Sequence, residues 1–185
     1  MEAFLISTGL VALAEIGDKT QLLALVLAAR YRKPLPIIFG ILIATLLNHA
    51  IAGWAGSWLS TLLDPSTLQW ALAISFIAMG AWMLVPDKYE EQCAREPRWG
   101  VFATTLVAFF VLEIGDKTQI ATVALAAKYD ALPAVVTGTT LGMMIANVPA
   151  VLIGEVAAKK FNVRAVQRIA AAIFIALGIG VLVAG

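Results

Sequence analysis

E-I-G-D-K-T-Q, at residues 15–21, occurs again without a change at residues 113–119. Each copy places two carboxylates and a lysine within an apolar run long enough to cross a bilayer. A charged side chain at the membrane centre costs about 3 kcal/mol on insertion scales, so such groups normally face a partner, a cavity or a transported ion. The repeated motif is therefore the feature from which we predict fold and function.

The composition is that of a polytopic membrane protein surrounded by a lipid bilayer. Of 185 residues, 61% are hydrophobic and 14% charged, and the mean hydropathy is +0.90. The 13 basic and 12 acidic residues give no basic surplus for nucleic acid. Cys93 is the single cysteine, which excludes an internal disulfide and a zinc-thiolate cluster. No basic segment precedes the first apolar run, so we expect a retained span and not a signal peptide.

Apolar stretches of about 20 residues, the length that a membrane-spanning helix needs, can be laid out six times. The sequence therefore predicts an all-α protein with six transmembrane helices. The expected spans are residues 4–29, 35–59, 68–85, 101–127, 132–156 and 166–184.

The chain contains an internal duplication. A shift of 98 positions superposes residues 4–31 on residues 102–129 with 12 of 28 identities. We therefore expect one three-helix repeat at residues 1–86, a cytoplasmic linker at 87–100, and a second repeat at 101–185. Because three spans are an odd number, the second copy must enter the membrane from the opposite side, which gives two inverted repeats. This arrangement recurs in secondary transporters that bind substrate near the midplane, where the repeats meet.

The loop charges predict the orientation. Ten of the 11 lysines and arginines outside the motifs lie in or directly beside the connections after the first, third and fifth spans, and only Lys128 lies on the other side. By the positive-inside rule these three connections are cytoplasmic, and both termini are extracytoplasmic.

On a continuous helix, the spacing of Glu15, Asp18 and Lys19 puts all three on one face, and the second copy repeats this pattern. Gly17 and Gly115 would permit either close helix packing or a local helix break that frees backbone carbonyls for the ion, and packing explains them at least as well. If the repeats bring the two faces together, four carboxylates converge as candidate metal ligands: Glu15, Asp18, Glu113 and Asp116.

An oxygen-rich site of this kind suits hard cations such as Ca2+, Mn2+ or Mg2+. The auxiliary oxygens would come from Thr20, Thr118, Gln21 and Gln119. With Lys19 and Lys117 as counterions, the fully ionised site carries two net negative charges, which one divalent cation or two protons would neutralise. This balance predicts cation/proton exchange and no separate cofactor. Asn48, His49 and Asn147 are weaker candidates for neutral ligands or proton-relay groups, and a neighbouring helix could equally satisfy them.

Three other interpretations compete with exchange. Glu15–Lys19 and Glu113–Lys117 could be intrahelical ion pairs that only make insertion tolerable, although this leaves both aspartates unexplained. Asp18 and Asp116 could share a proton in an intramembrane aspartyl hydrolase, but such a dyad needs neither the lysines nor the glutamates. The chain could also be a non-transporting membrane subunit. We favour a transporter over an enzyme, and the sequence leaves open whether it forms a homo-oligomer.

Two E-x-G-D-[KR]-[TS] motifs, one per half, resemble the signature of a family of cation/proton exchangers. This family includes the eukaryotic Golgi Mn2+/Ca2+ transporters and bacterial manganese exporters, and was formerly called uncharacterised protein family sixteen. The resemblance covers essentially the whole chain and rests on residues 15–20 and 113–118. It implies that the four motif carboxylates bind Mn2+ or Ca2+ and that protons move in exchange. The short central loop is similar to that of the compact bacterial members, which implies an inner-membrane exporter of Mn2+, with Ca2+ as the alternative.

Overall fold

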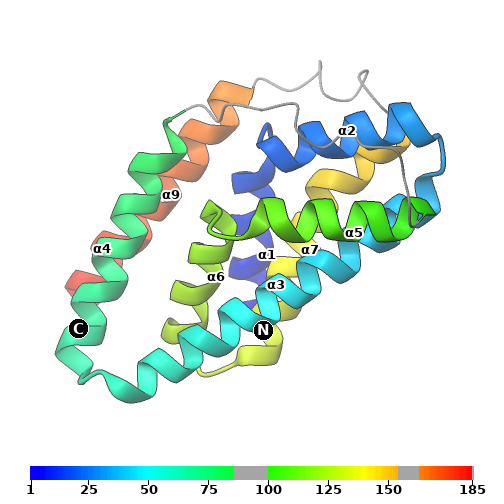
Figure 1. Ribbon diagram of the computed structural model, residues 1–185. Helices are drawn as coiled ribbons and strands as arrows, with labels where there is room; N and C mark the ends of the chain where they lie inside the picture. The colour runs from blue at the N-terminus through cyan, green and yellow to red at the C-terminus, as the bar shows by residue number, and fades with distance from the viewer. Residues whose placement is uncertain (86–99, 154–162, 185) are drawn as a thin grey trace.

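The computed structural model describes residues 1–85, 100–153 and 163–184. All regular secondary structure in these residues is helical, which confirms the all-α prediction (Figure 1). In chain order the helices are α1 (Glu2–Glu15), α2 (Lys19–Tyr31), α3 (Pro34–Leu62), α4 (Pro65–Met83), α5 (Gly100–Glu113), α6 (Lys117–Lys128), α7 (Leu132–Ile153) and α9 (Val163–Ala184).

Four of these helices are long and apolar enough to cross a membrane, and they match the second, third, fifth and sixth expected spans. They are α3, α4, α7 and α9, while α5 is a shorter apolar helix. Of the expected linker 87–100 only Gly100 is described, and the end of the fifth span, residues 154–156, also lies outside the described residues.

The first and fourth expected spans are each broken into two helices at the motif. Between α1 and α2, Gly17 has φ 81°, and between α5 and α6, Gly115 has φ 76°. Glycine adopts these left-handed angles without the steric cost that other residues meet, and they interrupt the helix. The expectation of one continuous helix through each motif, with its acidic and basic groups on one face, is therefore wrong. A local break, the other reading of these glycines, is the observed structure.

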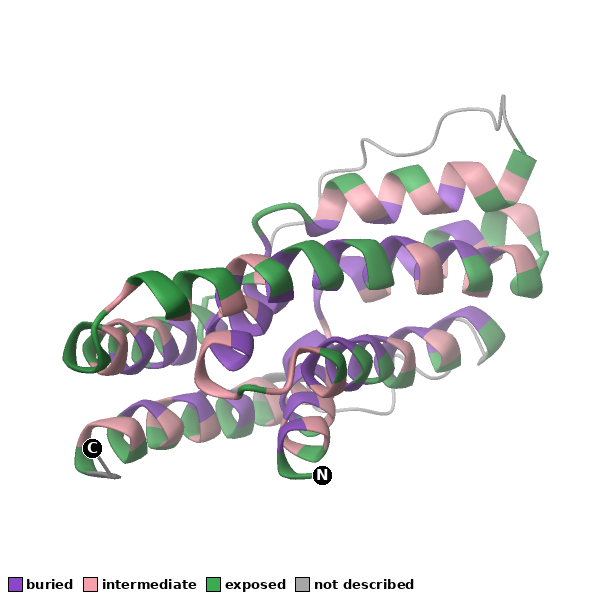
Figure 2. Ribbon diagram, turned by 90° about the horizontal axis from the view of Figure 1, so that it is seen from below, coloured by how far each residue is buried: buried purple, intermediate pink, exposed green. Residues whose placement is uncertain are grey.

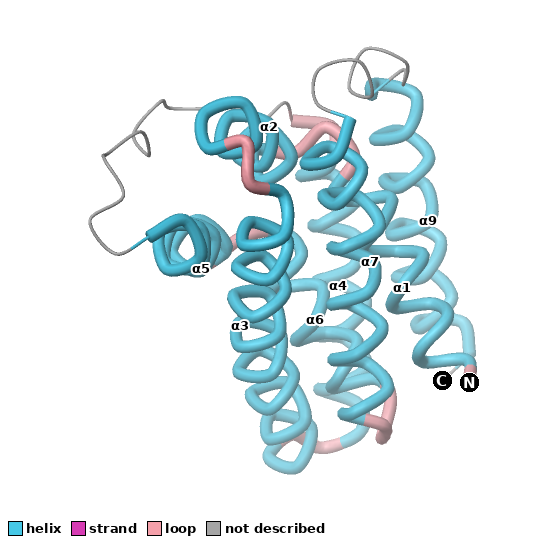
Figure 3. The backbone as a smooth tube through the Cα atoms, turned by 90° about the vertical axis from the view of Figure 1, so that its right-hand side faces the viewer, coloured by secondary structure: helices cyan, strands magenta, loops and turns pink. Residues whose placement is uncertain are grey.

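Each break is also a bend. In Figure 1, α2 and α5 run nearly across the view, whereas α1 and α6 run nearly up it. Figure 3 shows the same relationship from the side, with α5 seen almost end-on. The two motif loops therefore lie at the corners of two bent helix pairs.

The two halves of the chain pack with reciprocal contacts. Helix α1 packs on α7 and α5 packs on α3, while α4 and α9 pack on each other. A Cβ built on Gly40 would lie 2.8 Å from the Thr105 Cβ, and one built on Gly138 would lie 3.0 Å from the Ser7 Cβ. Gly138 lies 98 positions after Gly40, and Thr105 lies 98 positions after Ser7. The duplicated sequences therefore make the same contact twice across the interface between the halves.

Among the described residues, the buried apolar side chains form two clusters, one around Phe76 and Phe174 and one around Leu23, Ile37 and Phe109. Buried positions face the interior of the bundle and exposed positions lie on its outer surface (Figure 2). That outer surface carries many large apolar side chains, among them Ile74, Val111, Leu152 and Trp54. Such a surface fits contact with lipid better than contact with water.

Candidate metal site

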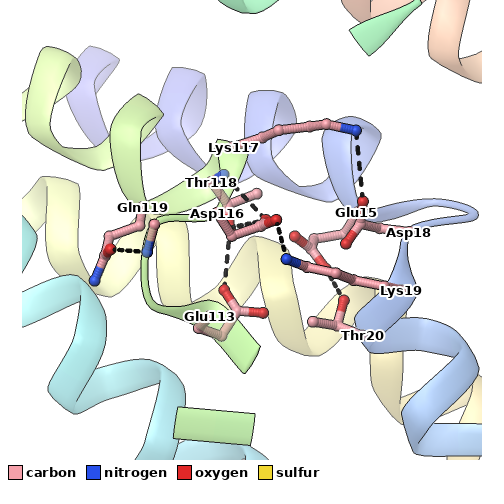
Figure 4. A network of polar contacts seen from close by, with 10 residues as sticks. Glu15, Asp18, Lys19, Thr20, Glu113, Asp116, Lys117, Thr118 and Gln119 are labelled. Carbon is pink, nitrogen blue, oxygen red and sulfur yellow. Dashed lines mark hydrogen bonds and ion pairs between the residues drawn. The ribbon is translucent and has the colours of Figure 1, made fainter. Parts of the chain in front are cut away.

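The two motif loops meet inside the bundle, and their carboxylates are buried (Figure 4). Glu15 and Glu113 are the last residues of α1 and α5, whereas Asp18 and Asp116 directly precede α2 and α6. All four residues are at most 3% exposed. A buried carboxylate is tolerated only where cations, protons or hydrogen bonds compensate its charge.

The backbone of each loop is held by its own glutamine. The Gly17 N–H donates to Gln21 Oε1 at 3.0 Å, and the Gly115 N–H donates to Gln119 Oε1 at 2.7 Å. The Gln21 side chain also donates through Nε2 to the Ala146 carbonyl at 3.0 Å, which ties the first loop to α7. These side-chain oxygens, expected as auxiliary ligands, are therefore engaged in fixing the loops.

Three of the four carboxylates converge. One oxygen each from Glu15, Glu113 and Asp116 lies within 4.8 Å of the others. Two oxygens that bind one cation at about 2.1 to 2.6 Å can be no farther apart than about 4 to 5 Å, so a single ion could bind all three. Asp18 does not belong to this three-carboxylate group.

Two oxygens of the group have no hydrogen-bond partner among the described residues. They are Glu15 Oε1 and Glu113 Oε1, and both are buried. An unpartnered buried oxygen on an ionised group is costly, because the group has left water without gaining a replacement donor or cation. Both oxygens therefore call for a cation or a proton.

The lysines pair with the aspartates of the opposite motif. Lys19 Nζ lies 2.8 Å from Asp116 Oδ1, and Lys117 Nζ lies 3.8 Å from Asp18 Oδ1. The break puts Glu15 and Lys19 on different helices, so the interpretation as intrahelical Glu–Lys pairs is wrong. The lysines instead join the two halves of the chain.

The motif threonines orient the glutamates. The Thr20 hydroxyl donates to Glu15 Oε2. The Thr118 hydroxyl lies 3.2 Å from Glu113 Oε2 and 3.4 Å from Asp116 Oδ2. Hydrogen bonds of this kind fix the direction of a ligand side chain and leave its second oxygen for the ion.

The weaker candidates lie on α3 and α7 and are all buried. Asn48 Nδ2 donates to the Phe110 carbonyl at 3.1 Å, and Asn147 Nδ2 donates to the Met143 carbonyl at 3.1 Å. Both ring nitrogens of His49 lack a hydrogen-bond partner within the described part of the chain. His49 is not a member of the three-carboxylate group.

Sequence reasoning assigned no role to Trp82, which lies beside the motifs. Lys117 Nζ is 5.9 Å from the centre of its indole ring. The position near the end of an expected span gives no signal of this contact, because it depends on how α4 packs.

Comparisons with known proteins match the chain to a family. The family model "Divalent cation/proton antiporter GDT1" matches residues 3–91 and 101–185. A Vibrio cholerae protein named "Putative manganese exporter" is 51% identical over 180 residues, which cover 97% of this chain and 90% of that protein. GDT1-like protein sll0615 of Synechocystis is 32% identical over 193 residues, covering 94% of this chain and 93% of that protein.

More distant similarity extends to plants. GDT1-like protein 3 of Oryza sativa is 24% identical over 204 residues, covering 96% of this chain and 72% of that protein. No solved structure is significantly similar to the chain. The family model covers both halves and both motifs, and the bacterial relatives are similar over nearly their whole length. The chain therefore belongs to the GDT1 family of divalent cation/proton antiporters.

Proposed function

We propose that this antiporter exports Mn2+ from the cytoplasm of a bacterial cell in exchange for protons, with the ion held by carboxylates of both halves. The observation that carries the proposal is the convergence of Glu15, Glu113 and Asp116 oxygens within 4.8 Å. Because these residues come from different halves, a relative movement of the halves would change the site. A transporter needs such a link between ion binding and conformation.

The ligand chemistry supports a hard divalent cation. The three-carboxylate group offers only oxygen, which suits Mn2+ and Ca2+ and disfavours soft metals. We choose Mn2+ because the Vibrio cholerae relative is named for manganese export. Ca2+ is the alternative cargo, since it accepts the same ligands at slightly longer distances.

The charge balance supports exchange for two protons. Asp18 and Lys117 offset each other, and Lys19 offsets one of the three converging carboxylates. Two net negative charges are left, so either one divalent cation or two protons would make the site neutral. The low dielectric of the interior penalises any other occupancy.

We further infer six membrane crossings in two inverted repeats, with α1–α2 and α5–α6 each serving as one broken span. The reciprocal contacts of Gly40 and Gly138 support this inference. So do the start of α1 and the end of α9, which lie at the same end of the molecule in Figure 3, as an even number of crossings requires. Broken helices at the midplane are common at transporter binding sites. The basic connections would face the cytoplasm and the termini the opposite side of the inner membrane.

The test is ion uptake into proteoliposomes with an acidic interior, measured for Mn2+ and Ca2+. We expect gradient-driven Mn2+ uptake by the wild type and its loss in Glu15→Gln and Asp116→Asn. Asp130→Asn, which removes an exposed carboxylate outside the site, is the matched control and should transport normally. Uptake that persists in both site variants would contradict the proposed site, and a faster Ca2+ flux would reassign the cargo.

A further inference from the structure

The two ion pairs that join the motifs are not equivalent, although the motifs are identical. The Lys19 side chain is 23% exposed, whereas that of Lys117 is 4% exposed. Both partner aspartates are buried to the same degree, at 3% side-chain exposure. Of the two motif lysines, Lys19 therefore has the more accessible side chain in the described part of the chain.

Trp82 accounts for part of this difference. The Lys117 ammonium lies 5.9 Å from the centre of the Trp82 ring, a distance within the range of a cation–π contact. The position 98 residues later is Gly180, where an added Cβ would meet nothing within 4 Å. At the position that corresponds to Trp82, α9 therefore offers no aromatic ring to Lys19.

Helix packing shows the same asymmetry. Helix α4 packs against α6, but the corresponding pair in the other half, α9 and α2, has minimal contact in the described residues. Likewise, α9 packs against α1, but the corresponding pair, α4 and α5, has minimal contact. In Figure 1, α4 and α9 lie together at the left beside α6, and α2 and α5 run to the right away from them. The α4–α9 pair therefore covers the side of the site where α1 and α6 lie.

From these observations we propose that Trp82 and the Lys117–Asp18 pair form the closed gate of this conformation, and that the ion reaches the carboxylates past Lys19. The inference rests on the proposed function and adds to it a side of entry and a gate residue. Trp82 acts as a positioning residue, because it touches Lys117 and not the three-carboxylate group. An exchanger must keep one route closed while the other is open, since two open routes would let ions and protons leak.

Cysteine labelling in detergent tests the gate without relying on transport. In a Cys93→Ser background, Lys19→Cys and Lys117→Cys would each be treated with a water-soluble methanethiosulfonate reagent. We expect position 19 to react about tenfold faster than position 117, the ratio that about 1.4 kcal/mol of protection would give. Equal rates at the two positions would overturn the proposal.

Trp82 variants separate gating from general packing. Adding Trp82→Ala should raise the labelling rate at position 117 by about tenfold and leave the rate at position 19 unchanged, whereas Trp82→Phe should keep position 117 protected. A rise at both positions would mean that the substitution loosens the whole bundle, and no rise would mean that the ring is not a gate. Either result overturns the proposal.

The transport readout distinguishes a failed gate from a failed function. In proteoliposomes, Trp82→Ala should let Mn2+ run down its own gradient without a proton gradient, while Trp82→Phe should stay coupled. If wild-type protein moves no ion but the labelling pattern holds, the proposed cargo is wrong and the gate stands. If the wild type exchanges ions and Trp82→Ala remains tightly coupled with position 117 protected, the gate is wrong and the function stands.

Discussion

Lys19 Nζ lies 2.8 Å from Asp116 Oδ1, so the lysine of the first motif offsets the charge of an aspartate of the second motif that belongs to the three-carboxylate group. In the proposed site, Asp116 therefore has two alternative cationic partners, the ammonium group of Lys19 and the transported metal ion. We expect ion binding to weaken this contact, because the cation and the ammonium group repel each other. The lysine would limit the cost of the site without metal and would compete with the metal for the charge of the same carboxylate.

This competition predicts the effect of Lys19→Gln. The variant should bind Mn2+ about tenfold more tightly, because a positive charge beside the ion is removed, and should turn over more slowly, because release is no longer assisted. Calorimetric titration in detergent gives the affinity, and proteoliposome flux gives the rate. Lys128→Gln, on the last residue of α6, is the control. Weaker binding by Lys19→Gln would show that the lysine supports the ion and does not compete with it.

A second prediction concerns the threonines. Thr20→Val keeps the shape of the side chain but removes the hydroxyl that donates to Glu15 Oε2, so the carboxylate loses its fixed direction. Loss of a residue that orients a metal ligand typically costs about 10- to 100-fold in affinity, and we expect a reduction in this range for Mn2+.

Matched variants make the threonine experiment specific. Thr20→Ser keeps the hydroxyl and should retain most of the affinity. Thr137→Val removes an exposed hydroxyl that bonds only within its own helix, to the Pro133 carbonyl at 2.6 Å, and should not alter binding. Equal affinities of Thr20→Val and the wild type would show that Glu15 is oriented by other groups.

The third prediction tests the helix break. Gly115→Ala should lower the free energy of unfolding by about 1 to 2 kcal/mol, because φ 76° is strained for an L-residue. The cost would come from backbone strain alone, since an added Cβ would meet nothing within 4 Å.

Gly9 provides the control for this measurement. It lies within α1 and also has open space around an added Cβ, but it has no positive φ. Gly9→Ala should therefore be neutral or raise stability by up to about 1 kcal/mol. Reversible denaturation in detergent would compare the two variants, and an equal effect of both substitutions would argue against a strain-bearing break.

The sequence predicted the helices that can be recognised from the length and hydropathy of an apolar stretch. It did not predict the helix breaks within the two motifs. The expected spans for α3, α4 and α9 lie within a few residues of the observed ends, because apolar length reports the span directly. A hydropathy pattern carries no information on φ, so Gly17 could be read either as a packing site or as a break. The φ angle of Gly17 in the structure decides between these two interpretations, and it shows a helix break.

The sequence predicted which kinds of residue form the candidate site, but not which lysine pairs with which carboxylate. The repeated carboxylates of the motif identified a buried acidic site, but helical spacing placed Lys19 next to Glu15 and not next to Asp116. Two identical heptapeptides also cannot predict that Asp116 joins the three-carboxylate group while Asp18 pairs with Lys117. This difference arises from the surroundings of each loop, such as the α4–α9 pair, which packs on one side only.

The last prediction concerns pH and lies outside the spans, at the start of α4. Hydrogen bonds from the Ser66 hydroxyl, the Thr67 hydroxyl and the Thr67 N–H hold the pKa of Asp64 well below its ordinary value. The depressed pKa means that the ionised cap stabilises the folded state above the unfolded pKa, about 3.9, and that this contribution is lost as the pH falls through the folded pKa.

Asp64→Asn and Asp64→Ala separate the charge of this cap from its hydrogen bonds. Asparagine keeps an acceptor for the helix N-terminus, so its melting temperature should lie below that of the wild type at neutral pH, and the difference should shrink as the medium is acidified. Alanine removes the acceptor and should remain destabilised throughout. Melting curves in detergent across this pH range would test both, with Asp130→Asn as the control. A difference between Asp64→Asn and the wild type that does not change with pH would mean that the charge of Asp64 contributes nothing to the cap.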